Sequence, residues 1–152
     1  MAADPRIVKQ IDQLIDLFNR RSLDLPDGVF TRQTQFLVNG VSFEEMLGRS
    51  PADALVLMLA RGAAGYRFAS KAVQHAMPDA RLQRGEFDET AKDEGRVVSG
   101  QCWLSGHLRG TGESSEILID VTLWFRASAA QRVSAALDPA ALAKLQEARL
   151  RA

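Results

Sequence analysis

Two runs of alternating apolar and polar residues, separated by a Gly/Ser-rich segment, lie within residues 96–126. The first run reads RVVSGQCWLSGHLR and the second reads EILIDVTLWFR. Two β-rich runs on either side of a short Gly/Ser segment predict a long antiparallel hairpin. We expect this hairpin to be the centre of a sheet on which the helices pack.

The alternation also sorts the hairpin into two faces, because successive side chains of a strand point to opposite sides. One face is wholly apolar apart from a cysteine, and its members are Val98, Cys102, Leu104, Leu108, Ile117, Ile119, Val121, Leu123 and Phe125. The other face is mixed, and its members are Val97, Gln101, Trp103, His107, Leu118, Asp120, Thr122, Trp124 and Arg126. A continuous apolar row most simply faces the core.

Apolar residues at helical spacing predict a helix over residues 5–21, with Asp4 as its cap. Further helices are expected from about residue 51, over residues 66–77 and over residues 139–149. Gly62 and Gly65 are expected to break the second of these helices before the third begins. Short strands are predicted over residues 33–38, 80–87 and 132–137, and a polar turn over residues 90–95. Residues 43–47 fit either a short strand or one helical turn.

Composition narrows the class of protein. The 152 residues fit one domain, residues 1–152, and the 19 basic and 19 acidic side chains cancel. Without a basic excess, nucleic acid is not an expected partner. No apolar run is long enough to span a bilayer, so no membrane partner is expected either. Cys102, the only cysteine, fits a reducing cytoplasm, and two histidines with one cysteine make a structural zinc site improbable.

Three pieces of the chain resemble one known family. They are the segment HAMPDARL at residues 75–82, the run over residues 96–110 with Gly106 and Gly110, and the stretch from residue 125 to residue 146. Together with the N-terminal helix they are similar to the NTF2-like (cystatin-like α+β cone) superfamily, in its SnoaL-like branch. The Asp-Gly-Lys turn usual before the last strand is replaced here by Ala129-Ala130-Gln131.

The resemblance implies an α+β fold in which a curved antiparallel sheet of about four to six strands forms a cone closed by the N-terminal helices. It further implies an apolar pocket inside the cone and frequent dimerisation through the convex face. Members of this superfamily include isomerases, epoxide hydrolases, polyketide cyclases and many binding proteins, so the fold alone selects no chemistry. A hot-dog fold is the competing architecture, but Gly62 and Gly65 argue against the long central helix that it needs.

No mechanism carries over from the enzymatic relatives. The isomerases use a tyrosine on the first helix and an aspartate after the first strand, whereas here the helix has no tyrosine and the strand ends in Leu37-Val38-Asn39. The epoxide hydrolases use an Asp-Arg-Asp network, and here one face offers only Asp120 and Arg126. Whether the chain is an enzyme is therefore left open.

The mixed face of the hairpin has two interpretations. In the first, it lines the pocket, with Asp120 as general base, His107 as general acid, and Trp103 and Trp124 as walls. In the second, which we favour, the apolar row packs on the helices and the mixed face is a dimer surface, since interfaces are rich in Trp and Arg. Phe18 and Tyr66 are further candidates for the pocket wall.

The leading hypothesis is a cytoplasmic homodimer that binds a small apolar ligand, without a cofactor or a metal. The alternative is a cofactor-independent isomerase, polyketide cyclase-like enzyme or hydrolase that uses Asp120 and His107. A third possibility is a structural dimerisation module whose pocket is filled by its own side chains.

Overall fold

A computed structural model of the chain describes residues 1–26, 28–43, 45, 61–92, 95–127 and 129–151. The helices in these ranges are α1 (Pro5–Asn19), α4 (Gly62–Ala76) and α5 (Pro139–Arg149). The strands are β1 (Phe30–Val38), β2 (Val41–Ser42), β3 (Arg81–Lys92), β4 (Gly95–His107), β5 (Ser114–Arg126) and β6 (Ala129–Ala136). The helix expected from about residue 51 lies outside the described residues.

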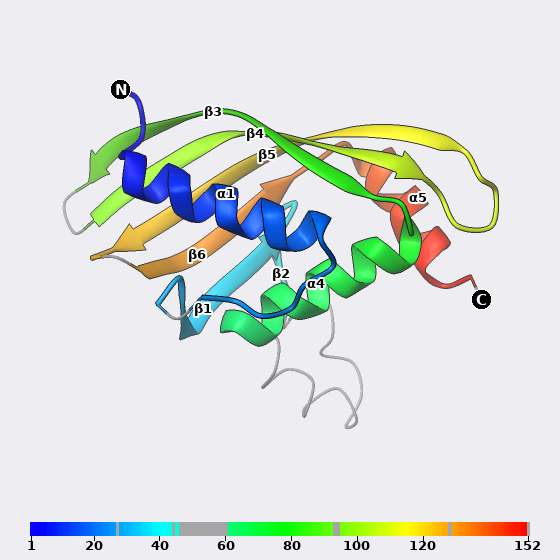
Figure 1. Cartoon of the computed structure of the whole chain (residues 1–152), viewed down its shortest axis with the longest axis horizontal. Coiled ribbons are helices and arrows are strands. Elements are labelled where there is room, and N and C mark those ends of the chain that lie inside the picture. Colours follow the sequence, from blue (N-terminus) through cyan, green and yellow to red (C-terminus); the bar gives the residue numbers. More distant parts are fainter. Residues whose placement is uncertain (27, 44, 46–60, 93–94, 128, 152) are drawn as a thin grey trace.

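The strands form one curved sheet in the order β2-β1-β6-β5-β4-β3 (Figure 1). The α+β architecture with a curved sheet is as predicted, and most neighbouring strands are antiparallel. The exception is the β1–β6 pair, which is parallel. A parallel pair needs a long connection between its strands, and here the chain passes through α4 and the other three long strands between β1 and β6.

The predicted hairpin is the β4–β5 pair, which is in continuous antiparallel register from Arg96↔Phe125 to His107↔Ser114. Its apolar residues face the helices: Val98 is 0% exposed, Leu104 is 2% exposed, and Leu123, the partner of Val98, is buried as well. The expectation that the apolar row faces the core is confirmed. The mixed row consequently lies on the opposite, outer face of the sheet.

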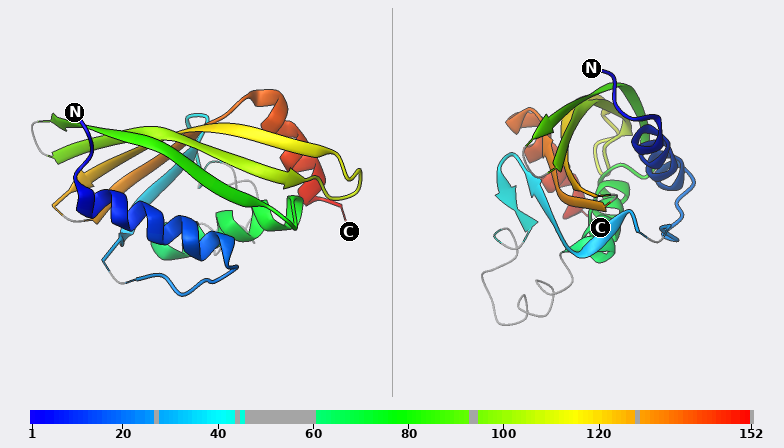
Figure 2. Two further views of the ribbon diagram at one scale, coloured as in Figure 1. Left: turned by 45° about the horizontal axis from the view of Figure 1, so that its top comes forward. Right: turned by 90° about the vertical axis from the view of Figure 1, so that its left-hand side faces the viewer.

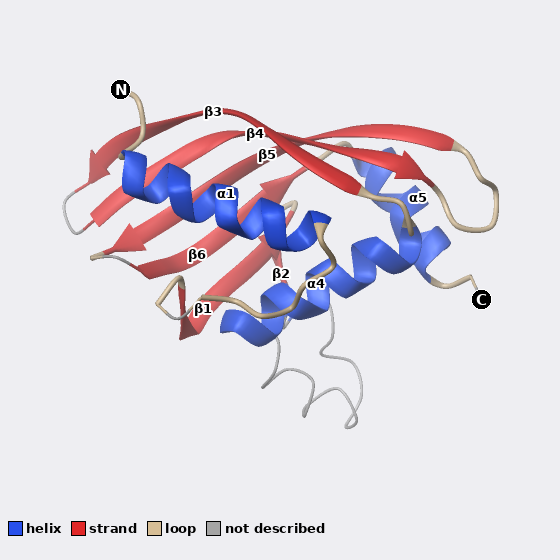
Figure 3. Ribbon diagram, in the orientation of Figure 1, coloured by secondary structure: helices blue, strands red, loops and turns tan. Residues whose placement is uncertain are grey.

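Helices α1 and α4 lie on the concave side of the sheet, as the end-on view in Figure 2 shows. The first helix begins where Asp4 accepts a hydrogen bond from the backbone N–H of Arg6 at 2.8 Å. Its buried stripe of Ile7, Ile11 and Phe18 faces the sheet. At the other end of the sheet, α5 adds Leu145 to the same core, and Figure 3 shows its place beside α4.

Several element bounds differ from those predicted. Helix α4 begins at Gly62 rather than at residue 66, and it contains Gly65 without a break. Gly62 has φ +64°, and a Cβ on it would lie 2.5 Å from the Thr31 carbonyl oxygen of β1. This glycine therefore lets the helix start close against the strand, where any side chain would clash.

The strands are longer than the sequence pattern indicates. Strand β3 runs to Lys92 and β4 begins at Gly95, so these described residues of the turn predicted over residues 90–95 belong to strands. Strand β1 begins at Phe30 instead of residue 33, and residues 129–131 belong to β6. Phe43 follows β2 and stacks on Phe36. Cross-strand pairing extends these strands into sequence that is locally polar or turn-like.

Candidate functional site

The concave face of the sheet and the helices line a cavity of about 310 Å³, which we call the inner cavity. Aliphatic side chains form most of its wall, among them Ile11, Leu14, Leu104, Ile119, Val121 and Leu123. Among the described residues that line it, none is an aspartate, glutamate, histidine, lysine or arginine. The cavity is therefore apolar and carries no charge in the part of the chain that the structure describes.

Aromatic rings from β1 and α4 gather at one part of the inner cavity. The Phe30 ring packs edge-on against Phe36 at 5.3 Å between centroids and lies 5.8 Å from the Tyr66 ring. Phe36 in turn stacks on Phe43 at 5.5 Å. Rings offset in this way favour contact with another flat ring.

The polar atoms of the inner cavity are few, and they are held in neutral groups. The Tyr66 hydroxyl donates a hydrogen bond to the Leu14 carbonyl oxygen at 2.9 Å, which ties α4 to α1. Burial raises the pKa of the Tyr66 phenol, and the nearby Ser70 hydroxyl partly offsets this rise. Burial likewise raises the pKa of the Cys102 thiol to about 11. The Tyr66 phenol and the Cys102 thiol therefore stay protonated at neutral pH, and neither is a ready base or nucleophile.

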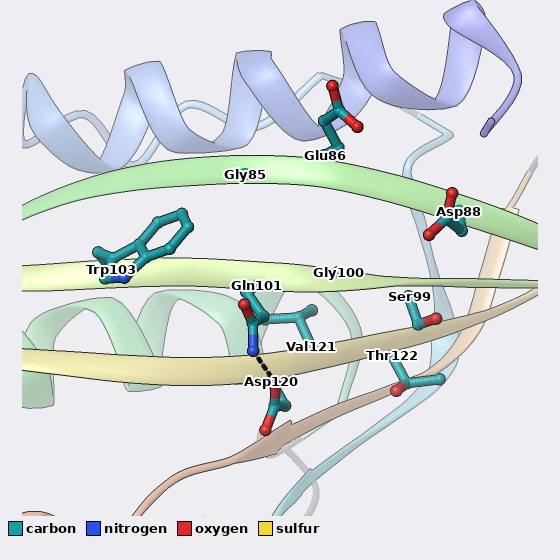
Figure 4. A pocket seen from close by; sticks show the side chains of 10 residues that line it. All are labelled: Gly85, Glu86, Asp88, Ser99, Gly100, Gln101, Trp103, Asp120, Val121 and Thr122. Carbon is teal, nitrogen blue, oxygen red and sulfur yellow. Dashed lines mark hydrogen bonds between the residues drawn. The ribbon is translucent and has the colours of Figure 1, made fainter.

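A second hollow, which we call the outer groove, lies on the outer face over β3, β4 and β5 (Figure 4). It has a volume of about 460 Å³. It forms where β3 bulges between Arg84 and Phe87, and the Trp103 indole lies beside Gly85. The side chains of Glu86, Asp88 and Asp120 give the groove an acidic character.

Asp120 and Trp103 lie on this outer face, not in the inner cavity. Asp120 is exposed, and it accepts a hydrogen bond from the Gln101 amide at 3.0 Å (Figure 4). Trp124 lies further along the same face, where the Arg132 guanidinium stacks on its ring at 5.4 Å. Leu118, the cross-strand partner of Trp103, is 44% exposed.

His107 lies at the end of β4, far from Asp120. Asp120 pairs with Gln101, six residues before His107, which places the two positions roughly 20 Å apart along the strand. The partner of His107 is Asp79: one carboxylate oxygen is 2.6 Å from the imidazole Nδ1 and the other accepts from the backbone N–H at 2.8 Å. These bonds from His107 lower the pKa of the Asp79 carboxyl. The structure does not bring Asp120 and His107 together as an acid–base pair.

Of the predicted pocket residues, Phe18 and Tyr66 line the inner cavity, whereas Trp103 and Trp124 do not. Ser70 also lines the cavity and is 5% exposed, although it was not among the predicted pocket residues. Its position one helical turn after Tyr66 is the signal that could have found it, because residues four apart share a helix face. The pairing of Asp79 with His107 was also missed, since 28 residues separate them.

The fold is that of the NTF2-like proteins. The chain is similar to an NTF2-like protein of unknown function from Burkholderia pseudomallei (TM-score 0.59, 16% identity, 91% of this chain and 95% of that chain). It is also similar to a candidate SnoaL-like polyketide cyclase from Jannaschia sp. CCS1 (TM-score 0.61, 12% identity, 95% and 96%). A third similar structure is TerC co-crystallised with polyporic acid (TM-score 0.57, 18% identity, 92% and 97%). No family model and no curated protein matches the sequence.

Over the described residues, no helix is long and apolar enough to cross a membrane. In the same part of the chain, no group of three or more His, Cys, Asp or Glu side chains is placed to hold a metal ion.

Proposed function

We propose that this protein binds a small, uncharged and largely apolar molecule in the inner cavity. The observation that carries the proposal is the wall itself: the described lining residues are aliphatic and aromatic, with two hydroxyls and one thiol as the polar groups. Concave sites of a few hundred Å³ with mostly apolar walls and few polar groups are typical of small-molecule sites. A charged ligand would lose its hydration here without finding an opposite charge on these residues.

The size of the inner cavity argues for an occupant. Protein interiors are close-packed, and voids larger than a water molecule are few. The inner cavity, at about 310 Å³, is larger than a packing defect and has the volume of a small-molecule site. The third hypothesis, a structural module whose pocket is filled by its own side chains, is disfavoured by this volume.

An enzymatic role for Asp120 and His107 is the weaker alternative. Neither residue lines the inner cavity, and the two are not neighbours. An isomerase, cyclase or hydrolase built on Asp120 would have to work in the outer groove, where Gln101 already holds the carboxylate. Loss of a turnover activity in Asp120→Asn with unchanged stability would support that alternative.

We further propose that the outer face pairs two copies of the chain. It presents Trp124, and also Trp103 beside its cross-strand partner, the exposed Leu118. Tryptophan and arginine are enriched in protein interfaces. Its charges are also separated: the acidic outer groove lies over β3, β4 and β5, and Arg132 lies on β6. A twofold pairing would bring the acidic part of one copy toward the basic part of the other.

The test of the ligand proposal is binding of naphthalene, followed by titration calorimetry or by NMR shifts of the cavity methyl groups. Naphthalene should bind to the natural chain and should bind at least about tenfold more weakly to Ala69→Leu, which fills part of the cavity. Ala72→Leu is the matched control, because residue 72 lies on the same helix and is not in the cavity wall. Equal binding by all three proteins, or none, would overturn the proposal.

A further inference from the structure

Two clusters of packed side chains give the inner cavity two walls of different chemistry. The first, which we call the aromatic wall, brings these rings to the cavity: Phe30, Phe36, Phe43 and Tyr66. The second, which we call the aliphatic wall, brings mainly branched side chains: Val73, Leu82, Leu104, Ile119, Leu137 and Leu145. Over the described residues, the two clusters have no member in common. The inner cavity is therefore apolar throughout but not uniform.

The rings of the aromatic wall follow one another without a gap. The Tyr66 ring of α4 lies 5.8 Å from the Phe30 ring of β1, measured between centroids. Phe30 lies 5.3 Å from Phe36, and Phe36 lies 5.5 Å from Phe43. These separations are those of favourable aromatic pairs, each of which adds about two- to tenfold in affinity beyond simple burial. A flat ring bound against this wall would gain the same kind of contact.

The aliphatic wall gives a bound ring no such partner. Its cluster brings one ring to the cavity, Phe18, and the Arg21 guanidinium already lies over that ring at 5.7 Å. The remaining ring of the described lining, Phe87, belongs to a third cluster that shares Phe30 with the aromatic wall and Leu82 with the aliphatic wall. Saturated side chains bind a neighbour through area and dispersion alone, and each buried CH₂ group adds about fourfold in affinity.

We infer that the molecule bound in the inner cavity is a neutral aromatic ring that carries an alkyl chain, with the ring on the aromatic wall and the chain along the aliphatic wall. This inference rests on the proposed function, since it needs an occupant in the cavity. A ring alone would leave the aliphatic wall without contacts, and protein interiors leave few such voids. The neutrality follows from the lack of any charged side chain among the described lining residues.

The first test locates the two ends of a probe in the natural chain. The probe is n-butylbenzene, and nuclear Overhauser effects report which side chains lie beside its protons. The ring protons should contact Phe36 and Phe43, and the terminal methyl group should contact the methyl groups of Leu104 and Leu145. Naphthalene, which also has ten carbons but no chain, should contact the aromatic wall only.

A matched pair of variants supplies the second test. Phe36→Leu and Phe18→Leu make the same change on the two walls, at side chains that are 7% and 6% exposed. By titration calorimetry, Phe36→Leu should weaken n-butylbenzene binding about two- to tenfold, as expected for a lost ring pair. Phe18→Leu should weaken it less than about twofold, because the chain of the probe lies on that side. Thermal melting checks that both variants are folded.

The outcomes separate this inference from the ligand proposal. If neither naphthalene nor n-butylbenzene binds, the ligand proposal itself fails. If n-butylbenzene binds with its methyl group at Phe36, or with both of its ends in contact with both walls, the inference is overturned and the apolar site stands. Equal losses in Phe18→Leu and Phe36→Leu also overturn it, since the two walls would then not differ in their contact with the ring.

Discussion

The β4–β5 hairpin has two faces made from one alternating sequence, and they differ in what they can do. The inner face, with Val98 and Leu104, is sealed under the helices and borders a cavity without described charges. The outer face, with Trp103 and Asp120, is open and holds hydrogen-bonded and charged side chains. Position along a strand thus decides between core and surface: moving by one residue changes the environment completely.

The largest expected contrast between the faces is in stability. Leu104→Ala removes a side chain that is 2% exposed, and it should lower the free energy of unfolding by about 3 kcal/mol. Leu118→Ala is the same change on the outer face, where the side chain is 44% exposed, and it should cost less than about 1 kcal/mol. Chemical denaturation of both variants measures the difference. Equal losses would mean that the two faces are not as distinct as the structure places them.

The outer face should show its own effect in self-association rather than in folding. Trp103→Ala should weaken dimerisation by about 2 kcal/mol, because tryptophans in the centre of interfaces commonly dominate binding. Sedimentation over a range of concentrations measures the dissociation constant, and thermal melting checks the fold. Thr122→Ala, on the same face and without an aromatic ring, should have little effect. A natural chain that stays monomeric at its highest soluble concentration would contradict the dimer proposal.

Two glycines at the β3 bulge allow a finer comparison of the faces. A Cβ on Gly100 would lie 2.7 Å from both the Phe87 ring and the Glu86 carbonyl oxygen, so Gly100→Ala should cost about 2 kcal/mol by overpacking the core. A Cβ on Gly85 would lie 3.0 Å from the outer end of the Trp103 indole, which can shift toward solvent. Gly85→Ala should therefore cost less than about 1 kcal/mol. The midpoints of chemical denaturation measure the loss of stability in each variant. A larger loss in Gly85→Ala than in Gly100→Ala would show that the Trp103 indole is fixed.

Much of the inner face could be predicted from the sequence, because alternation is a local signal. The apolar row from Ile117 to Phe125 is enough to assign the buried face and to place the hairpin in the sheet. The parallel pairing of β1 with β6 could not be predicted from the sequence. It joins segments almost 100 residues apart, and no local pattern sets the relative direction of the two strands. Gly62 was misread for a similar reason, since its contact with Thr31 belongs to the fold and not to the neighbouring sequence.

The candidate site was harder to predict than the fold. Alternation correctly gave Asp120 and His107 one face, but it does not tell how far apart two positions lie in a paired register. The two hydroxyl groups of the inner cavity, on Tyr66 and Ser70, needed a different signal: their spacing on one helix, together with the burial that only packing creates. A face can be read from the period of a strand, whereas a site depends on contacts between elements.

The smallest expected effect is a pH dependence confined to the exposed end of the outer face. His107 donates to Asp79 and lowers the pKa of that carboxyl below its ordinary value of 3.8. The folded state then binds the proton less readily than the unfolded chain, so the stabilisation is present above pH 3.8 and is lost as the pH falls through the lower folded pKa. The difference in melting temperature between the natural chain and Asp79→Asn should shrink as the pH falls below 3.8. The difference in melting temperature between the natural chain and Leu104→Ala should stay constant over the same pH range, because none of the described residues lining the inner cavity is a carboxylate. A parallel change in both variants would mean that the two faces are not electrostatically independent.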